Sequence, residues 1–210
     1  MRDFLRNNGL STALGAMFLL SLAGMIWTGQ AANNKELMDH ATAPLGILAY
    51  IESGSFLSSL FENWESEFLQ MAVYVVLTAV LFQRGSSESR DPDDPHRADE
   101  VVAWRGRYPV MAWFYAHSLG LTLAALFLAS FVLHWQFSMR AANEDAVLHG
   151  GEIATASSYL LDPQLWFESF QNWQSEFLST ALLVVLSIFL RHQGSPESKP
   201  VAAAKEDTGA

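Results

Sequence analysis

The chain has 210 residues, half of them apolar, with seven Trp, fourteen Phe and a formal net charge of -10. A surface of that sign gathers cations and repels nucleic acid and anionic lipid, so nucleic acid is excluded as a partner. Cysteine is absent, which excludes disulfides and thiolate metal sites and leaves the redox compartment open.

Four long segments carry no Asp, Glu, Lys or Arg: 10–29, 68–83, 108–139 and 177–190. The hydrocarbon core of a bilayer is ~30 Å thick and requires about 20 residues per helix. A soluble protein of this size rarely has two uncharged runs of that length. The sequence therefore predicts an all-α membrane protein with four transmembrane helices.

The first run, 10–29, also resembles a signal peptide, because Arg2 and Arg6 precede it and small residues follow it. Its counterpart later in the chain, 118–138, is internal and repeats the spacing of Phe18 and Ser21. We expect 10–29 to be a permanent helix.

A duplicated motif organises the rest of the chain. The segment 63–69, Asn-Trp-Glu-Ser-Glu-Phe-Leu, returns at 172–178 as Asn-Trp-Gln-Ser-Glu-Phe-Leu, and we call the separation of these two copies the repeat offset. Tyr50 matches Tyr159 at the repeat offset, 85–89 matches 194–198, and with one inserted residue 31–33 matches 141–143. We predict two tandem two-helix repeats, 1–90 and 107–199, with a cytoplasmic linker at 91–106 and a disordered tail at 200–210.

Each repeat crosses the membrane twice, so the two repeats run in the same direction, related by an axis along the membrane normal. The runs 68–83 and 177–190 span only about 24 and 21 Å as helices, so each helix must continue outward through the motif. Asp162 before Pro163 is a helix start, with Ser53 at the equivalent place. We predict helices near 53–83 and 162–191, and ordered helical outer connections that carry many apolar residues.

The distribution of Lys and Arg predicts the orientation. Ten of the twelve lie before the first run, at 84–107 or after residue 190; Lys35 and Arg140 are the exceptions. Positive residues stay cytoplasmic. Both termini are therefore predicted in the cytoplasm of a bacterial inner-membrane protein, with an acidic periplasmic face.

Polar residues recur at spacings of three and four along the first motif helix, including Asn63, Glu67 and Tyr74. They share one face, and polar side chains in membrane helices turn toward the bundle. Asn172 and Glu176 repeat the pattern. Glu67 and Glu176 would lie at equal depth and could share a proton or bind a cation; hydrogen bonding to neighbouring helices or a wet interface is the alternative.

His134 lies where it could meet a motif glutamate. A Glu, Glu and His set could bind a divalent cation, but no HExxH-like spacing supports a metal site, and an interhelical hydrogen bond is the favoured interpretation. We assign no metal and no cofactor. Trp64, Trp173 and Trp135 are expected to anchor the interface.

The duplicated motif, with a glycine-serine stretch after each following helix, resembles a family of uncharacterised bacterial multipass membrane proteins known as a domain of unknown function. The resemblance covers most of the chain and implies no activity, cofactor or catalytic residue. Glu65 stands where the second copy has Gln174, which marks Glu65 as a poor candidate for an essential site.

No catalytic motif of hydrolases, metalloproteases or nucleotide enzymes occurs, so an enzyme is the least supported class. The leading hypothesis is a structural, accessory or stress-related membrane protein, with the bilayer, a second copy of the chain or an unidentified membrane protein as partner. The alternative is a cation or proton channel or transporter lined by the polar face around Glu67 and Glu176.

Overall fold

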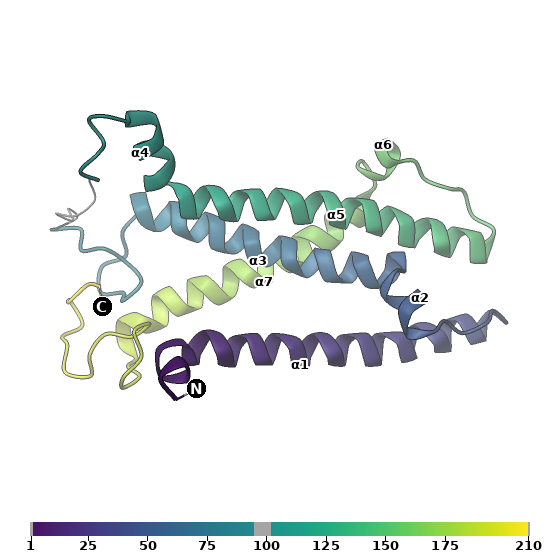
Figure 1. The fold of residues 1–210 in the computed structure, drawn as a ribbon, viewed down its shortest axis with the longest axis horizontal. Helices are drawn as coiled ribbons and strands as arrows, with labels where there is room; N and C mark the ends of the chain where they lie inside the picture. The colour runs from purple at the N-terminus through teal and green to yellow at the C-terminus, as the bar shows by residue number, and fades with distance from the viewer. Residues whose placement is uncertain (1, 95–101, 210) are drawn as a thin grey trace. The chain divides into compact units, whose positions relative to one another are not determined.

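The computed structural model describes residues 2–94 and 102–209, and within these all regular secondary structure is helical (Figure 1). The predicted all-α class is confirmed. The part of the linker at 95–101 lies outside the described residues. The described helices are α1 (Arg2–Asp39), α2 (Ile47–Ile51), α3 (Gly54–Val80), α4 (Pro109–Ala116), α5 (Ser118–His149), α6 (Ala156–Tyr159) and α7 (Pro163–Phe189).

The two motif helices, α3 and α7, begin where the sequence predicts and end two or three residues earlier. Each has 27 residues, so the motif is helical in both copies. The Asp162 side chain accepts a hydrogen bond from the backbone of Gln164, and Pro163 occupies the first turn. Ser53 plays the same part for α3, accepting from the backbone of Phe56 at 3.2 Å. These caps satisfy backbone N–H groups that lack an intrahelical partner.

The other two long helices extend further outward than their uncharged runs. Helix α1 continues to Asp39, with non-helical backbone angles at Asn8, and α5 continues to His149. The run 108–139 is divided into α4 and α5 at His117, whose φ of -111° and ψ of 8° are not helical. Short helices α2 and α6 follow in the two connections, which were predicted to be helical.

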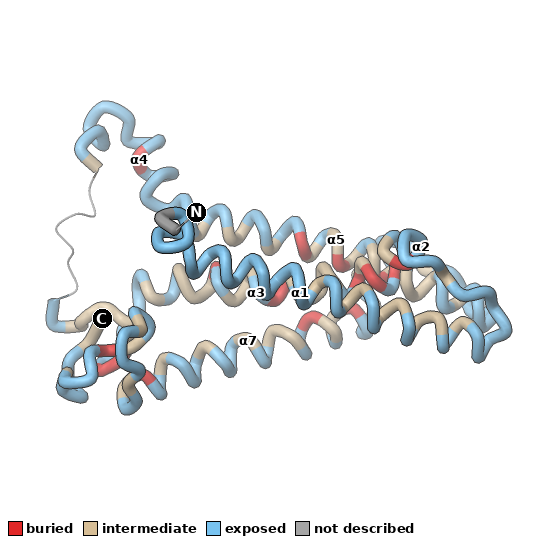
Figure 2. Tube along the Cα trace, turned by 60° about the horizontal axis from the view of Figure 1, so that its bottom comes forward, coloured by how far each residue is buried: buried red, intermediate tan, exposed pale blue. Residues whose placement is uncertain are grey.

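Large apolar side chains lie exposed along α1, which Figure 2 shows as almost unbroken pale blue over its first half. Among the described helices, α1 over Phe4–Asp39 and α5 are long and apolar enough to cross a membrane. In the most apolar part of α1 none of the residues is buried, and in α5 only 11% are. Within the described residues, the apolar part of neither helix is mostly buried, as that of a core helix in a water-soluble domain would be.

Two compact units make up the chain, and neither coincides with a sequence half. Unit 1 contains Met1–Leu60 and Trp135–Leu160; unit 2 contains Phe61–His134 and Leu161–Ala210. Each unit thus takes segments from both predicted repeats. The predicted division into repeats, linker and tail stays a prediction.

Matching asparagine contacts fix the ends of α1 and α5 in unit 1. The Asn34 side chain donates to the Leu45 carbonyl at 3.0 Å and accepts from its N–H at 2.7 Å. Asn143 does the same with Ala154, at 3.0 and 2.8 Å. Asn34 and Asn143 are separated by the repeat offset, and so are Leu45 and Ala154. Asn34 is therefore the counterpart of Asn143 in these contacts. The alignment that placed Asn33 there with an inserted residue is wrong.

Buried tyrosines close both connections of unit 1. Tyr50 is 5% exposed and Tyr159 is 3% exposed. The Tyr159 hydroxyl lies 2.8 Å from the Ser138 hydroxyl, whereas the Tyr50 hydroxyl lies against Gly29, where a Cβ would overlap its oxygen. Gly29 and Ser138 are also separated by the repeat offset, so a serine in one copy and a glycine in the other accommodate the same ring.

Matching serine turns follow α3 and α7 in unit 2. Ser89 accepts from the backbone of Gln83 at 2.8 Å, and Ser198 accepts from His192 at 2.9 Å. The residues from 201 to 209 have no regular secondary structure, but the ammonium of Lys199 donates to the backbone carbonyls of Ala204, Lys205 and Asp207. This segment, expected to be disordered, therefore has defined contacts in the structure.

Candidate functional site

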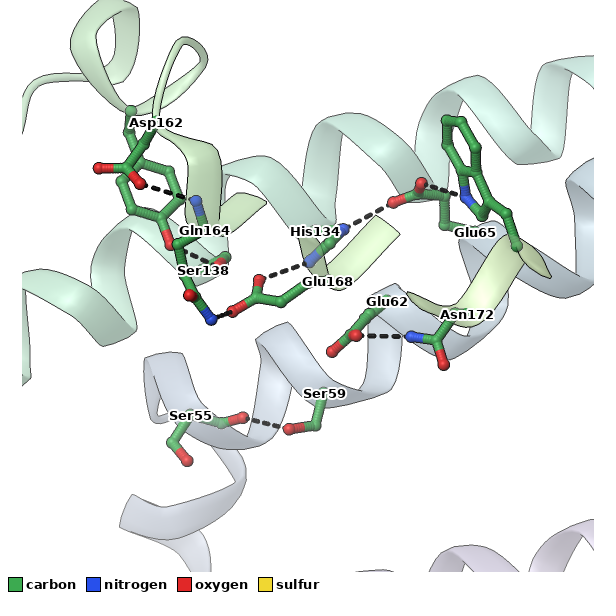
Figure 3. Close-up of polar contacts among 12 residues, drawn as sticks. Ser55, Ser59, Glu62, Glu65, His134, Ser138, Asp162, Gln164, Glu168 and Asn172 are labelled. Atoms are coloured by element: carbon green, nitrogen blue, oxygen red, sulfur yellow. Dashed lines mark hydrogen bonds and ion pairs between the residues drawn. The ribbon is translucent and has the colours of Figure 1, made fainter. Parts of the chain in front are cut away.

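A fully buried histidine is the centre of the candidate site, which lies within unit 2. His134, on α5, is 0% exposed. Its Nδ1 is 2.6 Å from Oε2 of Glu65 on α3, and its Nε2 is 3.3 Å from Oε2 of Glu168 on α7. Figure 3 shows the imidazole between the two carboxylates. Three helices far apart in the sequence thus meet at one ring.

Glu65 is also fully buried and satisfies two donors. Its Oε1 accepts a hydrogen bond from Nε1 of Trp173 at 2.9 Å, while Oε2 contacts His134. An unpartnered buried carboxylate would be strongly destabilising, and these two contacts remove that cost. Glu65 therefore connects the motif of α3 to the motif of α7 and to α5.

A third carboxylate, Glu62, lies near the ring, and both Glu62 and Glu168 are held by amide side chains. Glu62 accepts from Nδ2 of Asn172 at 2.5 Å, and Glu168 accepts from Nε2 of Gln164 at 2.8 Å. One ligand atom each from Glu62, His134 and Glu168 lies within 4.8 Å of the other two. Three side chains with metal-binding atoms therefore converge.

Helical spacing explains why these residues meet. Glu62 and Glu65 are three residues apart on α3, and Glu168 and Asn172 are four apart on α7, so each pair shares one face of its helix. Aromatic rings pack beside them: Phe131 lies 5.9 Å from Trp166, and Phe127 lies 6.2 Å from Trp173, between ring centroids.

The structure brings some of the predicted site residues to the cluster around His134 and places the others elsewhere. His134 contacts a motif glutamate, as expected, but the glutamate is Glu65. Asn172 holds Glu62 of the cluster. Glu67 is exposed and Glu176 half-buried, and they are near enough for their carboxylates to repel each other. Their role stays a prediction.

The other predicted residues lie away from the ring. The Asn63 side chain is exposed. The Tyr74 hydroxyl donates to Glu88 at 2.9 Å, in the turn after α3. Burial, followed by repulsion from Glu197, raises the pKa of Glu88, and the bond from Tyr74 opposes that rise.

Of the three predicted anchors, two donate their indole N–H groups within the protein: Trp173 to Glu65, and Trp135 to the Ala156 carbonyl at 3.1 Å. Trp64 packs edge-on against Phe61, with centroids 5.4 Å apart. Their placement at a membrane interface stays a prediction.

Sequence reasoning missed Glu62, Glu65 and Glu168. The available signal was the difference between the copies: Glu65 corresponds to Gln174, Glu62 to Gln171, and Glu168 to Ser59. The first helices differ likewise, since Met25 stands at the position of His134. Glu65, expected to be a poor candidate for an essential site, is the buried acid of this cluster; that it is not essential stays a prediction.

Comparison with known proteins gives a family and no activity. The family model described as Domain of unknown function (DUF6766) matches residues 1–210. No curated protein and no solved structure matches the chain.

Proposed function

Because the chain belongs to the DUF6766 family, whose function is unknown, we propose a role from its own residues. We propose an integral membrane protein of four transmembrane helices in two tandem parallel repeats, with a non-enzymatic structural, accessory or stress-related role. Its place is the bacterial inner membrane with both termini cytoplasmic. Its partners are the bilayer and a second copy of the chain or another membrane protein.

The exposed apolar surface of α1 carries this proposal. Leu10 and Leu20 are each 74% exposed, and so is Trp27. Covering apolar surface is worth about 25 cal/mol per Å², so a helix with this many bare side chains requires an apolar surrounding. A bilayer provides it along the whole length of α1.

The remaining two crossings are assigned to α3 and α7. At 1.5 Å per residue, 27 residues extend about 40 Å, more than the ~30 Å hydrocarbon core. Several matches at the repeat offset support the tandem repeat: the bounds of α3 and α7, the contacts of Asn34 and Asn143, and the serine turns. They also support a retained α1, because its counterpart α5 is internal.

The test is membrane extraction of the full chain. We expect the protein to sediment with membranes after alkaline carbonate washing and to dissolve only in detergent, because apolar helices stay in the bilayer when surface charges are stripped. A peripheral membrane protein in the same sample should be released. Recovery of the chain in the carbonate supernatant would contradict the proposal.

A cation or proton pathway is the second candidate. It is favoured by the polar face of α3 meeting that of α7: the Gln70 side chain donates to the Thr180 hydroxyl, and Glu67 lies near Glu176. We expect proteoliposomes to show a cation or proton current that the double substitution Glu67→Gln with Glu176→Gln abolishes. Glu36→Gln, an exposed glutamate on α1, is the control. Absence of current in the unmodified protein would eliminate this candidate.

A further inference from the structure

We propose that Glu62, His134 and Glu168 form a binding site for a divalent transition-metal ion such as Zn²⁺. His134 would bind through Nε2, and each glutamate through a carboxylate oxygen. Glu65 would act as a positioning residue that holds the opposite side of the imidazole. This inference does not depend on how many helices cross the membrane.

The two distances at the imidazole favour a metal ligand. Nδ1 is 2.6 Å from Glu65, a short contact typical of a charge-assisted hydrogen bond. Nε2 is 3.3 Å from Glu168, longer than an ordinary N–H···O bond of about 2.7–3.2 Å. Two ligands bound tetrahedrally at about 2.1 Å from zinc lie roughly 3.4 Å apart. The Nε2 and Glu168 atoms are already at that separation.

The hydrogen bonds around the site select the metal-binding nitrogen. When Nδ1 carries the proton and donates to Glu65, Nε2 presents its lone pair toward Glu62 and Glu168. This carboxylate–histidine–metal arrangement is usual around protein-bound zinc. Asn172 and Gln164 orient the two ligand carboxylates through amide hydrogen bonds, as a second layer around a metal does.

The charge of the cluster also calls for a cation. Three carboxyl groups face one imidazole, so the formal charge of the cluster is two negative units when all four groups are charged. Repulsion among partly buried carboxylates is costly, and a divalent cation would offset it. The imidazole nitrogen distinguishes the site from calcium and magnesium sites, whose ligands are oxygens.

The site is open enough to be loaded. The Glu168 side chain is 22% exposed, whereas His134 and Glu65 are enclosed. An ion could therefore enter from the Glu168 side and complete its coordination with water. The three ligand atoms already lie within 4.8 Å of one another, so only a small adjustment of the side chains is needed to reach zinc-ligand spacing.

The experiment is metal titration of the purified full chain after chelation. We expect one Zn²⁺ per chain by calorimetry, and visible absorption from Co²⁺ substituted at the same site. Glu62→Gln and Glu168→Gln should each weaken Zn²⁺ binding at least tenfold, because an amide oxygen is a poor ligand. Glu65→Gln should weaken it ~10–100-fold. Glu36→Gln should leave the affinity unchanged, and Ca²⁺ should not compete.

Thermal unfolding monitors the fold of each variant, and Zn²⁺ should raise the Tm of the unmodified protein but not of the two ligand variants. If a variant fails to fold, histidine NMR of the unmodified protein decides: Zn²⁺ should shift the ring nitrogen of His134. A shift of another histidine, equal affinity in the folded ligand variants, or no saturable binding below about 1 mM would overturn the proposal.

Discussion

Glu65 and Glu67 are two residues apart on α3, yet their environments are opposite. Glu65 is fully buried and pairs with His134 and Trp173, whereas Glu67 is exposed. Helical geometry places such neighbours on different faces. The carboxylate of Glu65 supports the packing of three helices, so its loss is expected to lower the stability of the fold.

We expect Glu65→Ala to destabilise the protein by about 3 kcal/mol, because it leaves the buried Nδ1 of His134 and the indole N–H of Trp173 without an acceptor. Gln174→Ala, at the equivalent exposed position of α7, should change stability by less than about 0.5 kcal/mol. Denaturant unfolding of the detergent-solubilised protein measures both. Equal effects of the two substitutions would mean that the Glu65 contacts contribute nothing specific.

The carboxyl group of Glu88, which lies outside the membrane helices, predicts that the stability of the protein depends on pH. Burial raises its pKa above the ordinary value of 4.5, so its contribution to stability is fully present below that value and is lost as the pH rises through the raised pKa. Glu88→Gln should therefore flatten the fall in Tm with rising pH. Glu206→Gln, exposed in the tail, should retain it. A Tm series at several pH values is the measurement, and unchanged slopes in Glu88→Gln would contradict the prediction.

At the scale of the element, α1 and α5 end in the same motif with different residues. The backbone N–H of Thr42 donates to the Leu37 carbonyl at 2.8 Å, and the backbone N–H of Gly151 donates to the Ala146 carbonyl at 2.8 Å. The left-handed position is Ala41 with φ of 56° in the first case, and Gly150 with φ of 70° in the second. Alanine is strained there and glycine is not.

Ala41→Gly should therefore stabilise the protein by up to about 1 kcal/mol, by removing the strain of a Cβ in the left-handed region. Gly150→Ala should destabilise it by a similar amount. Thermal unfolding of the two variants should show changes in Tm of opposite sign. A loss of stability in Ala41→Gly would show that the flexibility of glycine in the unfolded chain outweighs the relief of strain.

For the whole molecule, the compact units do not follow the sequence repeats. Unit 1 joins 1–60 with 135–160, and unit 2 joins 61–134 with 161–210. Each unit therefore contains parts of both halves. We expect the separate halves to fold poorly, because each would lack the partner segments of both units.

The absence of cysteine makes the proposed topology directly measurable. Single substitutions Gln83→Cys and Gln193→Cys, at exposed positions in the turns after α3 and α7, should be labelled only after the membrane is opened, because both turns are proposed to be cytoplasmic. Ala43→Cys and Glu152→Cys, in the outer connections, should react with an impermeant maleimide in cells whose outer membrane is permeable. The reverse pattern, or labelling of all four in intact membranes, would contradict four crossings with cytoplasmic ends.

The sequence by itself determined the helical class, both motif helices and their caps. These follow from local properties: uncharged runs, spacings of three and four, and Asp before Pro. It also placed His134 where it could meet a motif glutamate, although helical periodicity alone could not identify which glutamate. The lengths of α1 and α5 were underestimated, because their outer ends are polar yet remain helical.

Only the tertiary structure decided the site. Glu62, Glu65, His134 and Glu168 lie on three helices, and their convergence depends on how those helices pack, which no local pattern encodes. The same packing pairs Asn34 with Leu45, whereas the alignment of the two copies matches Asn33, not Asn34, with Asn143. Local sequence sets which face of a helix a residue occupies, whereas the burial of that face depends on residues distant in the chain.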